Sequence, residues 1–285
     1  MNSKVKRELR SPREIRKMRT AGLIVWQAHQ AAARILKPGV STLEINQAYR
    51  DTFAEYGAES LFLNYGARPG IPAFPAETCI SINEEVVHGI PGSRLIQTGD
   101  VVSLDTGCRL DGWCGDAAVT HAIGEIDQDS QRLLEVTNRV LDLAIELMGI
   151  KTKWSEVCER MEDYVVERGF FVVEDMVGHG IGKELHEPPQ VPNYYNEVLM
   201  KSEDFELRPG VVIAVEPMVN IGTQELVTLE DGWTVVTENR KNSAHFEHTL
   251  AVTKSGPMRL TGPPNDEELS TMPSWLHDKS TWIIW

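Results

Sequence analysis

The stretch GDVVSLDTGCRLDGWCGDAAVTHAI, residues 99–123, has the pattern of an antiparallel hairpin. Residues 101–110 and 113–123 have strand composition, and the Asp111-Gly112 pair between them is typical of two-residue hairpin turns. Gly99-Asp100 before the first strand indicates another turn. The stretch therefore predicts a strand, a tight turn and a return strand.

Two acidic residues of this hairpin fall on the same face. Pairing through the turn places Asp116 opposite Gly107, which is two residues from Asp105. Period-two alternation then makes Asp105 and Asp116 diagonal neighbours, roughly 7–8 Å apart at Cα. Such carboxylates repel each other unless a cation lies between them or one of them stays protonated. The simpler alternative is a pair of solvated aspartates on a surface hairpin.

The hairpin belongs to a pattern that occurs twice in the chain. GDVVSLD (99–105) returns as GVVIAVE (210–216), which puts Glu216 at the position of Asp105. Two helices precede each copy, and we expect them at residues 13–36 and 41–57, and again at 129–148 and 153–169. The repeat predicts two similar helix–helix–strand halves, about 12–125 and 126–254, with an acidic residue ending the same strand in each. Chance similarity of two α/β segments is the alternative.

Local signals complete this prediction. Ser11 with Pro12, and the capping box that begins at Ser41, mark the starts of the first two helices. Further strands are expected at 79–87, at 211–219, around a hairpin at Asp231-Gly232, and at 246–253. Residues 255–285 look like an appended tail, in which Gly256-Pro257 breaks regular structure and Trp282–Trp285 packs on the body or on a partner subunit.

Three further residues are candidates to join the aspartate pair. Glu216 lies in VVIAVEP, a run apolar enough to be buried on both faces, where an unpaired carboxylate would be costly. Glu247 lies in the apolar strand HFEHTLAV, between His245 and His248, which we expect to pack or to support rather than to ligate. His179 lies between two glycines, which leave its ring uncrowded and can adopt angles that other residues avoid. A glycine-rich turn that holds a hydrogen-bonded histidine is the alternative.

The candidate set is therefore Asp105, Asp116, His179, Glu216 and Glu247. Four hard carboxylates and one imidazole suit divalent first-row ions or magnesium better than a closed thiolate zinc site. The acids suffice for two ions about 3.5–4 Å apart that share bridging carboxylates, an arrangement that lowers the pKa of a bound water.

Composition limits the other functions. The 285 residues carry a net charge of −14, which argues against general nucleic-acid binding. Residues 1–19 differ, because they hold eight Lys and Arg against two Glu; this basic arm is either solvated or makes a small anionic contact, for instance with ribosomal RNA. No apolar run reaches membrane-spanning length, and no signal-peptide core is present. Four cysteines without zinc-type spacing predict reduced thiols in the cytosol.

Three segments resemble the type I methionine aminopeptidases of the pita-bread fold group: MVGHGIGKELHEPPQVPNY (176–194), CISINEEVVHGIPG (79–92) and EPMVN (216–220). The resemblance covers about residues 12–254, with a basic arm at 1–11 and a tail at 255–285. It implies an α+β pita-bread fold, in which two pseudo-symmetric halves and an antiparallel sheet enclose two divalent ions of cobalt, manganese, iron or zinc. It implies a monomeric cytoplasmic enzyme that removes the initiator methionine from nascent chains and peptides when the second residue is small. Such an enzyme works beside the ribosome, with no DNA or membrane partner.

The resemblance also implies roles for the metal set. Asp116 and Glu247 would bridge the two ions, Asp105 would complete the shell of one, and His179 and Glu216 that of the other. Water activated by the ions would attack the carbonyl of the first peptide bond, with Glu216 as proton acceptor.

Substrate-binding residues are implied in the same way. His88 would contact the substrate near the scissile bond, or else only cap the HGIPG turn, and His186 would stabilise the oxygen of the tetrahedral intermediate. The methionine pocket would draw on Cys79, Phe74, Tyr65 and Trp233. For Trp233, plain packing in the turn is the alternative.

Some residues depart from the family pattern. The loop YGARPGIPAF (65–74) is longer than usual and lacks a histidine, and Leu185 and His245 replace the usual phenylalanine and glutamine. These departures concern the shape of the pocket rather than the metal ligands. Two other functions stay open: a proline dipeptidase or aminopeptidase P, which would carry an extra N-terminal domain, and a non-enzymatic binding protein, which would be expected to have lost ligands.

Overall fold

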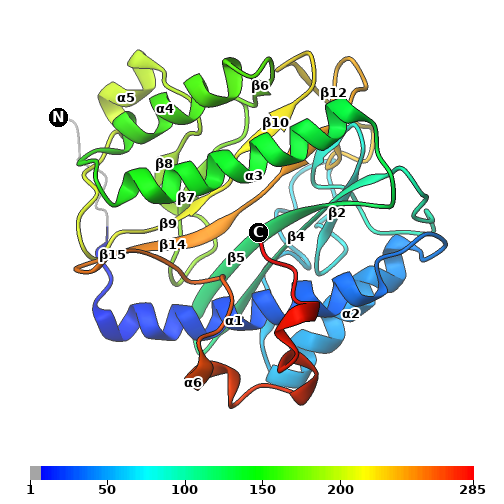
Figure 1. Ribbon diagram of the computed structural model, residues 1–285, viewed down its shortest axis with the longest axis horizontal. Helices are drawn as coiled ribbons and strands as arrows, with labels where there is room; N and C mark the ends of the chain where they lie inside the picture. The colour runs from blue at the N-terminus through cyan, green and yellow to red at the C-terminus, as the bar shows by residue number, and fades with distance from the viewer. Residues whose placement is uncertain (1–7) are drawn as a thin grey trace.

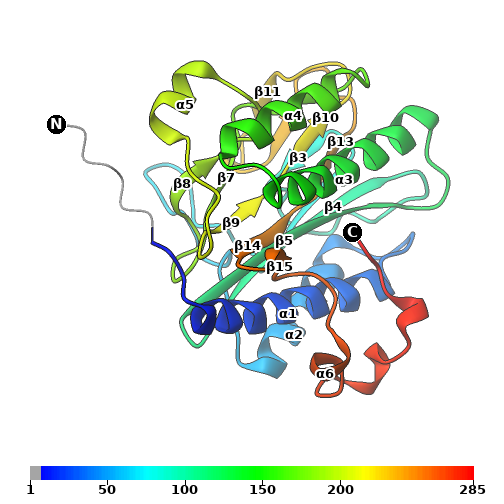
Figure 2. The same cartoon turned by 60° about the vertical axis from the view of Figure 1, so that its left-hand side comes forward.

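The computed structural model describes residues 8–285. Lys4, Lys6 and Arg7 of the predicted basic arm lie outside the described residues. Two helix pairs form separate rows, with the strands β5 (Trp113–Ala122), β9 (Val212–Val215) and β14 (His248–Thr253) between them (Figures 1 and 2). No helix within residues 8–285 is both long enough and apolar enough to cross a membrane.

The elements occur in the order that the repeat predicts. The first half contains α1 (Pro12–Ile35), α2 (Thr42–Tyr56), β1 (Glu59–Ser60), β2 (Cys79–Ile82), β3 (Glu85–Val87), β4 (Val101–Leu110) and β5 (Trp113–Ala122). The second contains α3 (Gln128–Met148), α4 (Trp154–Val166), β6 (Phe171–Val172), β7 (Gly178–Gly180), β8 (Glu187–Val191), α5 (Glu197–Glu203), β9 (Val212–Val215), β10 (Met218–Asn220), β11 (Leu226–Thr228), β12 (Val235–Thr237), β13 (Ser243–His245) and β14 (His248–Thr253). After them come β15 (Gly256–Arg259), α6 (Asp266–Leu269) and two short 3-10 turns at Ser274–Leu276 and Lys279–Thr281.

Helix ends follow the local chemistry of the sequence. Ser11 and Ser41 each accept a hydrogen bond from the backbone of the third helical residue, in full capping boxes. Gly57 ends α2 in the left-handed region at φ 62°, and Gly169, its counterpart in the second half, has φ 81°. The repeat is therefore present in the backbone as well as in the sequence.

The central hairpin has the predicted register. β4 and β5 pair antiparallel along their full length, with Gly107 opposite Asp116 and Asp105 opposite Ala118. One detail of the prediction is wrong, because Asp105 lies in the middle of β4 instead of ending it. Glu216, in contrast, directly follows β9.

The structure splits the predicted strands at 79–87, into β2 and β3, and at 211–219, and it shortens the one at 246–253. Residues 211–219 form β9 and β10, which belong to different sheets, because Pro217 has no N–H and cannot continue the ladder. The strand expected at 246–253 begins only at His248, and β13 before it pairs with β10 while β14 pairs with β9. Glu216 lies between β9 and β10, and Glu247 lies between β13 and β14. Both glutamates therefore lie where the chain crosses between the same two sheets.

Two further elements differ from the prediction. The helix α5 was not predicted, although Asn196 caps it through its side chain. Gly256-Pro257 does not break regular structure, because both residues belong to β15, which pairs with β14. The first residues of the predicted tail therefore extend the five-stranded sheet β15-β14-β9-β7-β8.

Hydrogen bonds join the two halves along β5. Glu247 N donates to Ala118 O (2.9 Å), and Asp116 N donates to Thr249 Oγ1 (3.0 Å). Thr120 Oγ1 bonds both the carbonyl and the amide of His245. The edge of the first half is thereby attached to β13 and β14 of the second.

Helix α1 lies against β5 through glycine contacts. A Cβ on Gly22 would lie 2.2 Å from Leu260 O, and a Cβ on Gly115 would lie 2.8 Å from Gly22 N. Atoms cannot approach that closely, so both positions require glycine for the helix to pack at this distance.

We expect Gly22→Ala to lower the free energy of unfolding by about 1–3 kcal/mol, because the backbone around Leu260 must move. Urea denaturation measures this change. The control is Gly92→Ala, where an added Cβ meets nothing within 4 Å. Equal stability of the two variants would contradict the close contact.

Candidate active site

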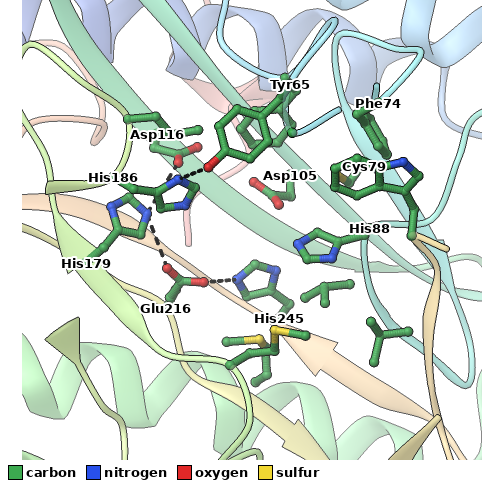
Figure 3. A pocket seen from close by; sticks show the side chains of 18 of the residues that line it. Tyr65, Phe74, Cys79, His88, Asp105, Asp116, His179, His186, Glu216 and His245 are labelled. Atoms are coloured by element: carbon green, nitrogen blue, oxygen red, sulfur yellow. Dashed lines mark hydrogen bonds and ion pairs between the residues drawn. The ribbon is translucent and has the colours of Figure 1, made fainter. Parts of the chain in front are cut away.

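All eleven site residues predicted from the sequence line one cavity of about 470 Å³. They are Asp105, Asp116, His179, Glu216, Glu247, His88, His186, Cys79, Phe74, Tyr65 and Trp233. Figure 3 shows the labelled acids and histidines directed toward one another, with Phe74 and Cys79 on the opposite side. The cavity therefore has a polar wall and an apolar wall.

The polar wall combines residues of both halves. Asp105 lies on β4 and Asp116 on β5, whereas His179 lies on β7 and the two glutamates flank β9 and β14. Single ligand atoms of Asp116, His179 and Glu247 all lie within 4.8 Å of one another. His179 Nε2 is 3.9 Å from Asp116 Oδ2 and 3.5 Å from Glu216 Oε1.

The glycines beside His179 are required for close packing of neighbouring strands and not for unusual backbone angles. Neither Gly178 nor Gly180 has a positive φ, so the expectation of unusual angles is wrong. A Cβ on Gly178 would lie 2.4 Å from Ala214 O, and one on Gly180 would lie 2.3 Å from Pro188 O. Glycine is needed because β8 and β9 pack too closely on β7 for a side chain.

The protonation of His179 suits a ligand. Burial lowers the pKa of its imidazole to about 3, so the ring is neutral at ordinary pH. Its Nδ1 donates to Gly180 O (3.0 Å), which leaves the Nε2 lone pair facing the acids.

The four carboxylates repel one another in this enclosed space. The pKa values of Asp105, Glu216 and Glu247 lie well above the usual range. Burial is the largest cause, and the negative charges of neighbouring acids are the next. Burial raises the pKa of Asp116 to about 7. Asp105 Oδ1, Asp116 Oδ1 and Glu247 Oε1 are buried without any hydrogen-bond partner in the described structure. Oxygens left without partners in a group of acids fit the coordination shell of a divalent cation, which would satisfy them and offset the repulsion.

The two histidines that flank Glu247 in sequence lie in different places. His245 lines the cavity, and its Nε2 is 3.8 Å from Glu216 Oε2. His248 points away from the cavity, with Nδ1 2.9 Å from Thr261 Oγ1 and Nε2 3.1 Å from Trp285 O. Their predicted assignment as packing or supporting residues agrees with these positions.

Tyr65 contacts a histidine as well as the pocket. Its hydroxyl lies 2.7 Å from His186 Nδ1. The tyrosine hydroxyl can donate to this nitrogen or accept from it, so the contact orients the imidazole in either tautomer. The ring of His186 also lies edge-on to His179, with centroids 4.3 Å apart. Sequence reasoning assigned Tyr65 to the pocket alone, because nothing local links two residues 121 positions apart.

The apolar wall is a small separate cluster. It consists of Phe74, Ala76, Cys79 and Trp233. Phe74 lies edge-on to Trp233 at 5.4 Å between centroids, and His88 does so at 6.2 Å. Trp233 therefore packs in this cluster and also lines the cavity. Sequence reasoning missed other lining residues, namely Phe62, Arg68, Met176, Met218 and Val235.

The chain is similar to known metallopeptidases. The model of metallopeptidase family M24 matches residues 16–254. Methionine aminopeptidase 1 of Bacillus subtilis is 41% identical over 87% of this chain and 96% of its own length. The methionine aminopeptidase of Aquifex aeolicus is 42% identical over 89% of this chain and 98% of its own.

Solved structures of methionine aminopeptidases are also similar to this chain. The methionine aminopeptidase of Thermotoga maritima is 37% identical, with a TM-score of 0.83, and the match covers 90% of this chain and 99% of that one. The prolidase of Pyrococcus furiosus is 21% identical with a TM-score of 0.70, and the match covers 91% of this chain but 66% of that one. The prolidase therefore shares the pita-bread fold but has a further part that is not matched. The chain belongs to metallopeptidase family M24 and, within it, to the methionine aminopeptidases.

Proposed function

We propose that the protein removes the N-terminal methionine from nascent proteins and peptides whose second residue is small. The observation that carries this proposal is a cavity with two unlike walls. One wall holds four carboxylates and an imidazole, and the other is the apolar cluster around Trp233. A hydrophobic side chain can occupy the second wall while the first peptide bond lies against the first.

The proposal includes two divalent ions of cobalt, manganese, iron or zinc. Asp116 and Glu247 would bridge them, because both are buried and close to His179. Asp105 would bind one ion, and His179 and Glu216 the other. Bound ions would polarise the scissile carbonyl and lower the pKa of a water molecule.

The chain's own residues then handle protons and charge. Glu216, with one oxygen 3.5 Å from His179 and the other 3.8 Å from His245, is placed to accept a proton from the attacking water. With the Tyr65 hydroxyl as the donor to Nδ1, His186 would carry its proton on Nε2 and would donate a hydrogen bond to the developing oxyanion. His88 would contact the substrate beside the scissile bond.

The apolar wall would bind the methionine side chain. Cys79, Phe74 and Trp233 offer soft and aromatic surfaces, which a thioether favours. Tyr65 would close this pocket at the solvent side, where it is 42% exposed.

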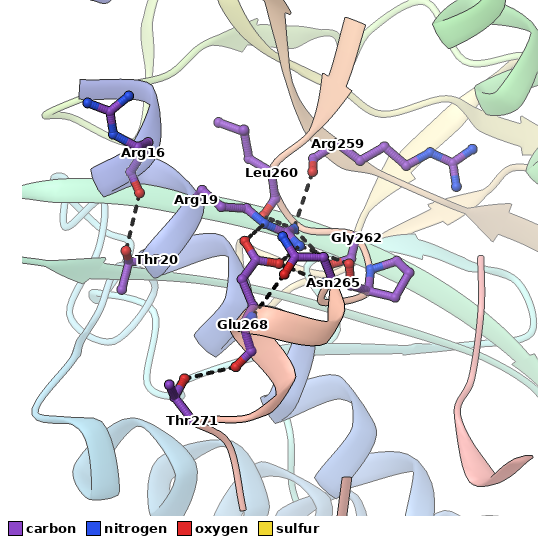
Figure 4. A network of polar contacts seen from close by, with 10 residues as sticks. Arg16, Arg19, Thr20, Arg259, Leu260, Gly262, Asn265, Glu268 and Thr271 are labelled. Carbon is purple, nitrogen blue, oxygen red and sulfur yellow. Dashed lines mark hydrogen bonds and ion pairs between the residues drawn. The ribbon is translucent and has the colours of Figure 1, made fainter. Parts of the chain in front are cut away.

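We also propose that residues 12–254 form the catalytic domain, with a basic arm at 1–11 and a C-terminal segment at 255–285. The buried Arg19 of α1 attaches that C-terminal segment to the domain through hydrogen bonds. Its guanidinium bonds Leu260 O, Gly262 O and Glu268 (Figure 4). Farther along, the ring of Trp282 packs on Trp26 at 5.0 Å between centroids.

The cellular part of the proposal is a monomer in the cytosol that contacts the ribosome through the basic arm, with no DNA partner. Its cysteines at 79, 108, 114 and 158 are unpaired and buried, as a reducing compartment would require.

Release of methionine from a short peptide tests the proposed activity. With added Mn(II) or Co(II), the protein should release methionine from Met-Ala-Ser and should leave Ala-Pro intact. Met-Pro serves as a second comparison, because a proline dipeptidase would prefer it. Amino-acid analysis of the products measures the reaction. Inactivity of folded, metal-loaded protein with several metals would favour a binding protein.

Substitution of either bridging carboxylate tests the proposed arrangement of the two metal ions. Asp116→Asn or Glu247→Gln should weaken the binding of both ions by at least about tenfold, because each change removes a charged donor shared by the two sites. Isothermal titration of metal-free protein measures both affinities. Asp105→Asn is the matched control and should weaken one ion much more than the other. A bridging variant that keeps two ions at wild-type affinity would refute this assignment.

A further inference from the structure

The loop YGARPGIPAF (65–74) presents an arginine where the cavity meets solvent. Arg68 lines the cavity and is exposed. His186 and Tyr65, which also line the cavity, are exposed on the same open side. The predicted functions of the site residues leave this arginine without a role.

The loop has a defined structure around Arg68. Arg68 N donates to Ile71 O (3.1 Å), and Ile71 N donates to Arg68 O (2.9 Å), which closes a two-residue turn. Pro69 and Gly70 occupy that turn, and Gly70 has the positive φ of 81° that such a turn favours. At the base of the loop, Phe74 N donates to Tyr65 O (2.9 Å).

Trp233 fixes this loop against the apolar wall. Its Nε1 donates to Pro72 O (2.8 Å). A Cβ on Gly66 would lie 2.7 Å from the indole, so the loop backbone rests directly on the ring. The Arg68 guanidinium carbon lies 5.6 Å from the same ring centroid, within the range of a cation–π contact.

The Arg68 guanidinium forms no ion pair with a carboxylate of the described residues. Within residues 8–285, no carboxylate oxygen lies within 4.0 Å of its side-chain nitrogens. Asp231, in the neighbouring turn, already accepts from Trp233 N, Thr234 N and Thr234 Oγ1. The positive charge of Arg68 acts on His88 in the cavity. Burial, then His186 and, to a smaller extent, Arg68 lower the pKa of His88 to about 4.

We propose that Arg68 is a specificity-determining residue that binds a carboxylate of the substrate on the carboxyl side of the scissile bond. This inference rests on the proposed function and names the substrates that the same site prefers. With methionine in the buried apolar pocket, the rest of the peptide must leave through the open side of the cavity, where Arg68 is exposed. The carboxylate is either an acidic side chain near the third residue or the free carboxyl end of a short peptide.

The acids of the polar wall do not oppose this preference in the metal-loaded protein. Four carboxylates and two divalent ions carry equal and opposite formal charges. Among the Lys, Arg, Asp and Glu residues that line the cavity, Arg68 is the one outside this acidic set. Guanidinium groups bind carboxylates through two parallel hydrogen bonds, so the recognition is directional as well as electrostatic.

The test compares three peptides with the metal-loaded protein: Met-Ala-Asn-amide, Met-Ala-Asp-amide and Met-Ala-Asn with a free carboxyl end. We expect kcat/KM to be about two- to fivefold higher for one or both anionic peptides than for the neutral one, the range of an exposed ion pair. The difference should lie in KM and should shrink in 0.5 M salt. The two anionic peptides separate a side-chain carboxylate from a terminal one.

Arg68→Gln should lower the ratio of kcat/KM between the anionic and the neutral peptides to about one, and Arg68→Lys should retain part of the preference. The exposed Arg16→Gln on α1 is the matched control and should behave as wild type. An unchanged preference in Arg68→Gln would overturn the proposal. An equal loss on all three peptides would also overturn it, because that result indicates a structural contact with Trp233. If wild-type protein releases methionine from no peptide, the proposed function itself fails and this inference fails with it.

Discussion

Repulsion among four carboxylates in one enclosed cavity is the constraint on which the structure of the site depends. Asp116 and Glu247 are buried, and oxygens of Asp105, Asp116 and Glu247 have no hydrogen-bond partner among the described residues. A fold does not gain stability by gathering unpaired charges in this way. Protonation of some of the acids or binding of cations removes this repulsion, and membership of a metallopeptidase family agrees with the binding of cations.

The convergence of these acids follows from how the repeated halves are joined. Each half contributes a long strand, and β5 of the first half bonds β14 and the residues before it in the second. Glu216 and Glu247 lie where strands leave one sheet for another, so neither residue belongs to a continuous ladder there. Their side chains are therefore free to point into the cavity, beside the hairpin that carries Asp105 and Asp116.

Trp233 organises the other side of the cavity. It packs on Phe74 to form the apolar wall, and its indole nitrogen holds the loop through Pro72. The same ring lies beneath the guanidinium of Arg68. One side chain thus links the shape of the apolar wall to the position of the loop at 65–74.

The sequence by itself determined the four long helices, the caps of the first two, and the register that places Asp105 and Asp116 on one face. These features depend on local periodicity and turn chemistry. The resemblance of short motifs was enough to name His88, His179 and His186. Only the tertiary structure decided that Glu216 and Glu247 lie at sheet crossings, that Tyr65 bonds His186, and that the glycines beside His179 admit neighbouring strands. Those features depend on which distant segments pack together, and no local pattern encodes a contact between side chains more than a hundred residues apart.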